Sequence, residues 1–269
     1  MQAAFFDLDK TIIAKSSALV FGRPFYKEGL ITRGHIVKGM YAQLVYSLIG
    51  ADENKMDRMR AALLELTKGW DKERVSTLVR ETLQEIIDPI IFAEALELID
   101  EHREAGRRIY IVSSSAEEIV KPLAEYIGVM NVIATRATID AEGKYSGELE
   151  FYAYAEGKRE AIESEARKMG IDLEDSYAYS DSATDLPMLE AVGHPHAVNP
   201  DKELRKAAEE RGWPILNFQN PVSLRRRIAG RVEKVPRPSP TAAALAGAAV
   251  LAVIGWAWLR RTRGDRAAA

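Results

Sequence analysis

Apolar residues near the start of the chain form a short run that ends abruptly in acidic residues. Residues 3–6 read Ala-Ala-Phe-Phe, and Asp7-Leu8-Asp9 follows them. A continuous apolar stretch of this kind is typical of a parallel strand buried on both faces. In open α/β sheets, ligands bind beyond the carboxyl ends of such strands. The pattern therefore predicts a buried strand that ends in two carboxylates; an acidic turn without chemistry is the alternative.

A second apolar run leads into a cluster of serines. Residues 108–112 predict a strand, and Ser113-Ser114-Ser115 follows directly. Serine is a preferred helix N-cap, so the cluster is expected to cap the helix that comes next. Hydroxyl groups beside the free N–H groups of a helix start bind anions. This segment therefore predicts an anion site.

Two further segments bring a cation and two more carboxylates. Lys158 lies near the start of a helix whose apolar face continues through Ile162. Residues 176–180 predict a short strand, and the loop after it carries Asp181 and Asp185. Carboxylates that lie close together repel one another, so a cation, a shared proton or a substrate must offset their charge. Together the four segments predict one site.

These segments, in this order, resemble the four motifs of the haloacid dehalogenase superfamily over residues 3 to about 217. Asp7-Leu8-Asp9-Lys10-Thr11 matches the family's DxDxT, and the later motifs match Ser113, Lys158 and the pair Asp181 and Asp185. The order and spacing look most like subfamily IB, the phosphoserine-phosphatase-like branch. The resemblance implies an α/β fold, with a Rossmann-like parallel sheet, helices on both faces and a small helical cap inserted after the first motif.

The same resemblance implies a role for each of these side chains. Asp7 is expected to form an aspartyl-phosphate, and Asp9 to protonate the leaving oxygen and then activate water. Oxygen atoms are expected to hold Mg²⁺ from Asp7, Asp9 (its backbone carbonyl), Asp181 and Asp185. The phosphoryl group is expected to bind Thr11, Ser113, Ser114 and Lys158.

The sequence leaves alternatives open for both the reaction and the substrate. A phosphotransferase or mutase would use the same intermediate, and a binding module would have no catalysis.

Asp9-Lys10-Thr11 is similar to a motif of P-type pumps, but Ile13 stands where the pumps have a second Thr. Lys10, where the family usually has Gly, is either a solvated turn residue or a charge near the substrate mouth. Phosphoserine phosphatases carry a Glu soon after the motif I Thr, whereas here no carboxylate occurs before Glu28, which disfavours an amino-acid phosphate.

Helical periodicity fills the chain between the first two motifs. Apolar residues recur at helical spacing in three segments, 33–47, 56–66 and 73–87. Residues 15–87 therefore look like the cap of subfamily IB, which closes over the phosphate; a merely structural helical hairpin is the alternative. The catalytic core is then residues 1–14 and 88–222. Within it, residues 134–149 predict a β-hairpin beside the site.

Composition limits the other classes of function. The chain has 269 residues and a net charge of −3, which argues against a nucleic-acid partner. It has no cysteine, so disulfides and thiolate metal sites are excluded. The histidines show no metal-ligand spacing and are expected on the surface or in loops, at positions 35, 102, 194 and 196.

The C-terminal tail predicts a membrane anchor; a weakly packed alanine-rich helix is the alternative. Residues 223–240 form a basic, proline-rich linker, and residues 241–259 carry no charge. A helix over that stretch is about 28 Å long, close to the bilayer core of about 30 Å. Tryptophans near its end and arginines in residues 260–269 are typical of the membrane interface. We expect a single span that holds the catalytic domain at the cell membrane, in the cytoplasm because no N-terminal signal is seen, near small-molecule or lipid phosphate esters.

Overall fold

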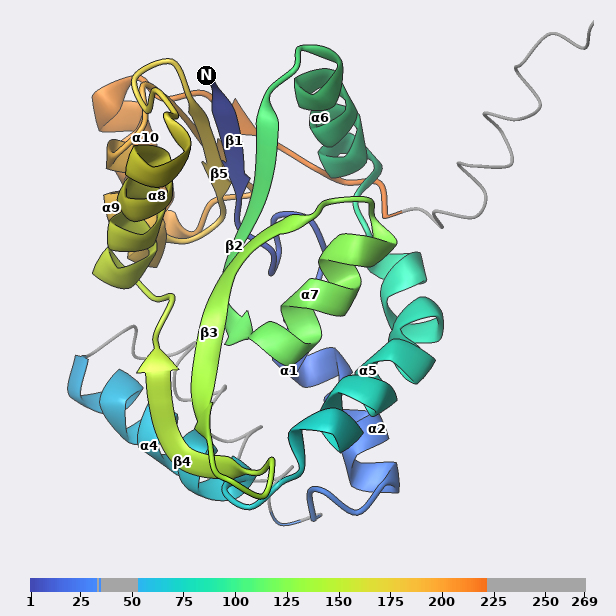
Figure 1. Cartoon of the computed structure of the whole chain (residues 1–269). Coiled ribbons are helices and arrows are strands. Elements are labelled where there is room, and N and C mark those ends of the chain that lie inside the picture. Colours follow the sequence, from blue (N-terminus) through green and yellow to red (C-terminus); the bar gives the residue numbers. More distant parts are fainter. Residues whose placement is uncertain (33, 35–52, 222–269) are drawn as a thin grey trace, which may run out of the picture. The chain divides into compact units, whose positions relative to one another are not determined.

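A sheet of seven strands runs through the part of the protein that the structure describes (Figure 1). The computed structural model describes residues 1–32, 34 and 53–221. The strands are β1 (Ala3–Phe6), β2 (Arg108–Ala116), β3 (Asn131–Ile139), β4 (Tyr145–Phe151), β5 (Tyr177–Ser180), β6 (His194–Val198) and β7 (Ile215–Leu216). Their order is β4-β3-β2-β1-β5-β6-β7, and neighbouring strands are parallel except for β3 and β4. The predicted α/β fold with a mostly parallel sheet is confirmed.

β1 lies between β2 and β5 and is buried along its whole length. Phe5 pairs with Tyr110 of β2 on one side and with Ala178 of β5 on the other. A strand with two parallel neighbours and helices over both faces needs apolar side chains in both directions, which explains its unbroken apolar sequence. The carboxyl ends of the three strands meet at one edge of the sheet, so the side chains that follow them share that edge.

Helices cover both faces of the sheet (Figure 1). On one face α5 (Lys72–Ile87), α6 (Ala93–Glu104) and α7 (Glu117–Tyr126) join an apolar cluster with Phe6 and Ile111. On the other face α8 (Glu156–Met169), α9 (Leu186–Glu190) and α10 (Lys202–Arg211) pack with Phe5 and Tyr110. The side chains of neighbouring residues in one strand therefore pack on opposite faces of the sheet, because side chains alternate along a strand.

The two ends of the insertion between β1 and α6 lie side by side and are joined by backbone hydrogen bonds. Its described elements are α1 (Ser17–Val20), α2 (Gly22–Lys27), α4 (Glu53–Thr67), α5 and the 3₁₀ turn η1 (Asp88–Ile90). The Ala14 N–H donates to the Ile90 carbonyl at 2.8 Å, and the Phe92 N–H donates to the Ile12 carbonyl at 2.9 Å. The exact division into core and cap stays a prediction.

The turn between α4 and α5 is bound to the β3–β4 hairpin. The Gly69 N–H donates to the Tyr145 carbonyl at 2.8 Å, and the Tyr145 N–H donates to the Trp70 carbonyl at 3.0 Å. The Lys72 N–H donates to the Gly143 carbonyl at 3.1 Å. The inserted helices are therefore held to the hairpin at this end. The predicted β-hairpin itself is confirmed.

Of the three helices predicted in the insertion, two can be compared with the structure. The helices predicted over residues 56–66 and 73–87 are confirmed as α4 and α5, whereas the one over 33–47 lies largely outside the described residues. Among the helices of residues 1–32, 34 and 53–221, none is both long and apolar enough to cross a membrane. The predicted span at 241–259 lies outside the described residues, together with the linker and tail beside it.

Two local predictions are wrong. The serine cluster does not cap α7, because β2 continues in pairing with β3 as far as Ala116, which becomes the N-cap without a side-chain hydrogen bond. His102 is not on the surface: it is only 3% exposed and packs on α6 against the sheet. Its Nε2 lies 2.8 Å from the Tyr179 hydroxyl, and a buried imidazole with such a partner is tolerated.

Candidate active site

Lys158 joins two carboxylates at the edge of the sheet where β1 and β5 end. Its Nζ lies 2.6 Å from Oδ1 of Asp7 and 2.7 Å from Oδ2 of Asp185. Lys158 is 2% exposed, and both carboxylates are buried with it. Because Lys158 stands in the first turn of α8, that helix places a cation against the strand ends. The structure thus brings together three residues predicted for one site.

The acidic loop after β5 completes this edge and contains the 3₁₀ turn η2 (Ala183–Asp185). The Ser180 hydroxyl donates to Oδ2 of Asp185 at 2.6 Å. Asp181 is buried, and its Oδ2 lies 3.7 Å from Nζ of Lys10. Lys10 is exposed and has a φ of 60°, a left-handed conformation that glycine adopts more easily. Lys10 is therefore both a turn residue and a charge beside the site.

Asp9 is surrounded by hydroxyl groups from two other segments. Its Oδ1 accepts the backbone N–H of Ser17 at 2.8 Å. Its Oδ2 accepts the Ser17 hydroxyl at 3.2 Å, the Ser115 hydroxyl at 3.4 Å and the Ser16 hydroxyl at 3.5 Å. The Ser17 and Ser115 hydroxyls also lie 2.7 Å apart. The predicted acid–base residue is thus held by α1 and by the end of β2.

The remaining predicted phosphate ligands have different surroundings. Ser113 is buried, and its hydroxyl oxygen accepts the Ser115 N–H at 3.2 Å. The Ser114 side chain is exposed, and its carbonyl accepts the Thr135 hydroxyl at 2.8 Å. Thr11 is fully buried, and its hydroxyl finds no hydrogen-bond partner among the described residues. Phosphate binding by these side chains stays a prediction.

Burial and neighbouring charges move the pKa values of Asp7, Asp181 and Lys158. Burial raises the pKa of Asp7 well above its ordinary value; Lys158 opposes this rise, and the charges of Asp185 and Asp181 add to it. Burial raises the pKa of Asp181 to about 7 against the opposing charge of Lys10. Burial alone would lower the pKa of Lys158, but Asp185 and Asp7 outweigh it and raise that pKa. The site therefore holds a charged lysine and more carboxylates than its own cations offset.

The motif residues and the fold agree with one protein family. The chain matches the family model described as haloacid dehalogenase-like hydrolase over residues 4–190. The chain belongs to this family. The matched segment contains the nucleophile candidate Asp7, Lys158 and the two carboxylates of the acidic loop.

Relatives place the chain among the phosphatases of the haloacid dehalogenase family. A Streptomyces azureus protein, "Inhibition of morphological differentiation protein", is 52% identical over 261 residues, covering 97% of this chain and 94% of its own. A probable phosphatase of Mycobacterium tuberculosis is 52% identical over 251 residues, covering 93% and 84%. A phosphoserine phosphatase of that species is 33% identical over 255 residues, covering 93% and 79%. The chain is a phosphatase-type hydrolase of the phosphoserine-phosphatase-like kind.

Solved structures show the same fold. A Bordetella pertussis protein of unknown function has a TM-score of 0.69 and 27% identity, covering 80% of this chain and 97% of its own. An apo phosphoserine phosphatase has a TM-score of 0.56 and 22% identity, covering 82% of this chain and 94% of its own. At that identity the second likeness concerns the fold alone.

Phosphatases of this family typically depend on Mg²⁺, and the residues present fit that ion. Within the described residues no group of three His, Cys, Asp or Glu side chains is arranged to hold a metal, so the trio Asp7, Asp181 and Asp185 does not enclose one by itself. Oδ2 of Asp185 is hydrogen-bonded to Lys158, and its part in binding a metal stays a prediction. Asp7, Asp181 and the Asp9 carbonyl suit Mg²⁺, because this ion completes its shell with water and substrate oxygens. Burial, together with the charges of neighbouring carboxylates, raises the pKa of Asp7 and Asp181, and a divalent cation would offset the cost of their negative charge.

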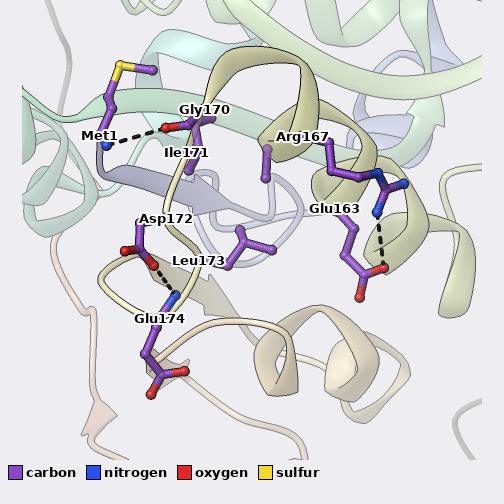
Figure 2. Close-up of a pocket in the computed structure, with 9 residues that line it drawn as sticks. Met1, Glu163, Arg167, Gly170, Ile171, Asp172, Leu173 and Glu174 are labelled. Carbon is purple, nitrogen blue, oxygen red and sulfur yellow. Dashed lines mark hydrogen bonds and ion pairs between the residues drawn. The ribbon is translucent and has the colours of Figure 1, made fainter.

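A pocket of about 720 Å³ lies away from these residues (Figure 2). It is formed by the end of α8, residues 170–174 and Met1, whose amino group donates to the Gly170 carbonyl at 3.3 Å. These residues lie at the amino ends of β1 and β5, whereas Asp7 and Asp181 follow the carboxyl ends. The pocket therefore has no part in the site described above.

Sequence reasoning missed the hydroxyl groups that hold the carboxylates, among them those of Ser17, Ser115 and Ser180. Ser17 and Ser115 bind Asp9, and Ser180 binds Asp185. Ser115 lies inside the serine cluster and Ser180 at the end of a predicted strand, so their positions were a usable signal. Ser17 had none, because its contact with Asp9 depends on how α1 turns back toward the strand ends.

Proposed function

We propose that the protein is a Mg²⁺-dependent phosphatase that hydrolyses a phosphate monoester through an aspartyl-phosphate on Asp7. The observation that carries this proposal is the buried group of Asp7, Lys158 and Asp185, with contacts of 2.6 and 2.7 Å. It stands directly after the central strand, at the edge where open α/β sheets bind ligands. A lysine there can bind phosphoryl oxygens and keep the nucleophile in one orientation.

The chain's own residues supply the nucleophile and the group that moves the proton. Oδ2 of Asp7 attacks phosphorus while Lys158 holds Oδ1, and the bond from phosphorus to the ester oxygen breaks. Asp9 gives its proton to that oxygen; burial raises the pKa of Asp9, which favours the protonated form. Asp9 then takes a proton from the water that attacks the aspartyl-phosphate, which releases phosphate and restores Asp7.

The oxygens of Asp7, Asp181 and the Asp9 backbone carbonyl would hold Mg²⁺, whose charge stabilises the phosphoryl oxygens when it is bound. Lys158 supplies a second positive charge from the protein itself. Its hydrogen bond to Asp185 keeps the ammonium directed at the strand ends, so the lysine is oriented before the substrate arrives.

Phosphate release from a panel of phosphate monoesters tests the proposal. Asp7→Asn is expected to leave less than about one per cent of wild-type turnover because it removes the nucleophile. Asp9→Asn is expected to reduce turnover by about 10²- to 10⁴-fold with the fold retained. EDTA should abolish activity, and added Mg²⁺ should restore it. Turnover by Asp7→Asn above a few per cent, or full activity in metal-free buffer, would contradict the mechanism.

We also propose that the C-terminal tail tethers the enzyme to the cell membrane, with the catalytic domain in the cytoplasm. This proposal is supported by the uncharged residues 241–259, which are long enough for one span, and by the basic residues on both sides. A tethered site would have access to soluble phosphate esters and to lipid head-group phosphates alike.

A further inference from the structure

The contacts of Asp9 come from parts of the chain that are far apart in sequence. Ser17 is fully buried at the start of α1, and Ser115 is half-buried near the end of β2, 98 residues later. Their hydroxyls lie 2.7 Å apart and both reach Oδ2 of Asp9, while the Ser17 N–H holds Oδ1. Both carboxylate oxygens are therefore held, which restricts rotation of the group.

The β2 strand is irregular at Ser115. The pairing of β2 with β3 shifts register between Ser113 and Ala116, and the Ser113 hydroxyl oxygen accepts the Ser115 N–H at 3.2 Å. Bulges of this kind re-aim side chains near active sites. The hydroxyl of Ser115, which lies between these two paired positions, bonds Asp9 and Ser17.

We propose that Ser17 and Ser115 are positioning residues that hold the Asp9 carboxyl group in the orientation needed to protonate the leaving oxygen. The inference rests on the proposed function, in which Asp9 passes one proton to the ester oxygen as its bond to phosphorus breaks. Hydroxyl groups suit this task because each can both donate and accept a hydrogen bond, so the contacts persist while the proton moves. A lysine or arginine could only donate.

The test compares two esters that differ in their need for a proton. Glycerol 2-phosphate releases an alkoxide that must be protonated, whereas 4-nitrophenyl phosphate releases a stable phenolate. Ser115→Ala and Ser17→Ala are expected to lower kcat/KM for glycerol 2-phosphate by about tenfold or more, and for the aryl ester by less than about threefold. The kcat/KM values cover only the steps up to the aspartyl-phosphate, so the shared hydrolysis step does not mask the difference.

Two further variants separate positioning from packing. Ser115→Thr keeps a hydroxyl and should retain the wild-type ratio of the two kcat/KM values. Ser76→Ala removes a buried hydroxyl from α5 and should leave both values unchanged. The double variant Ser17→Ala/Ser115→Ala should lose less than the product of the single losses, because the two hydroxyls bond each other.

Equal losses on both esters in Ser115→Ala, or no loss on glycerol 2-phosphate, would overturn the inference while leaving the phosphatase function intact. If Ser17→Ala, whose side chain is fully buried, does not fold, Ser115→Ala alone decides. A wild-type enzyme that hydrolyses neither these esters nor any of the panel would instead refute the proposed function, and the inference with it.

Discussion

Lys158 and His102 are both buried basic residues, yet their pKa values move in opposite directions. Burial opposes the charge on each side chain, but Lys158 lies against two carboxylates that raise its pKa above the ordinary value. His102 is buried near the guanidinium of Arg107, and its pKa falls to about 4. At neutral pH the lysine is therefore charged and the histidine neutral, and the difference comes from the neighbours that each one meets.

The neutral state of His102 predicts that the fold is sensitive to acid. Its pKa is 6.5 in an ordinary environment and about 4 in the folded protein, so between these values only the unfolded chain binds the extra proton. Stability from this residue is complete above pH 6.5 and is lost as the pH falls toward 4. We expect a loss of about 2 kcal/mol in the free energy of unfolding, allowing for partial screening by water.

Urea denaturation between pH 7.5 and pH 4.5 measures this loss. His102→Gln keeps a polar group beside the Tyr179 hydroxyl but does not titrate, so the carboxylates still contribute equally in both proteins. The variant is expected to show a shallower decline in stability with acid than the wild type. The same decline in both proteins would exclude His102 as the cause.

At the scale of elements, the first turn of α8 lies too close to its neighbours for a side chain at Gly157. A Cβ there would overlap the backbone carbonyl oxygen of Tyr152, and the Gly157 N–H donates to the Tyr154 carbonyl at 2.9 Å. The backbone cannot move away without shifting the turn. Because Lys158 is the next residue, this close approach helps to determine where its ammonium lies.

Gly157→Ala is therefore expected to affect both stability and chemistry. The overlap should cost about 1–3 kcal/mol in the free energy of unfolding, and the displaced Lys158 should lower kcat by about tenfold or more. Gly193→Ala creates a similar overlap with the Glu174 carbonyl away from the site and should lower stability with little change in kcat. Gly22→Ala meets no atom within 4 Å and is the neutral control. Equal changes of kcat in the first two variants would contradict the prediction.

At the scale of the whole molecule, the proposed tether is independent of the site. Deletion of residues 236–269 is expected to move the protein to the soluble fraction while its turnover of a small soluble phosphate ester is preserved. Deletion of residues 260–269 alone keeps the uncharged stretch and should leave the protein in the membrane fraction. A full-length protein that is soluble without detergent, or is released by alkaline carbonate, would refute the span and remove the main support for a lipid substrate.

The strands β1, β2 and β5, the β3–β4 hairpin and the helices α4, α5 and α8 were predictable because their signals are local. The apolar run of β1 follows from burial on both faces, and the α4 and α5 predictions follow from helical periodicity. The serine cluster failed as a helix cap because pairing with β3 extends β2 over it. The prediction that His102 lies on the surface was wrong because α6 packs this side chain against the sheet, where its ring nitrogen meets the Tyr179 hydroxyl. Neither contact can be predicted from the local sequence, because each joins residues that are far apart in the chain.

The sequence by itself determined the family, the fold class and the identity of the residues that stand at the strand ends, because each follows from short motifs in a particular order. Only the tertiary structure decided which of these residues meet. Lys158 bonds Asp185 as well as Asp7, and Ser17 and Ser115 share Asp9. Such pairs depend on which strands are neighbours and on how α1 and α8 pack against them. The free energy of these contacts comes from residues far apart in sequence, so no local pattern predicts it.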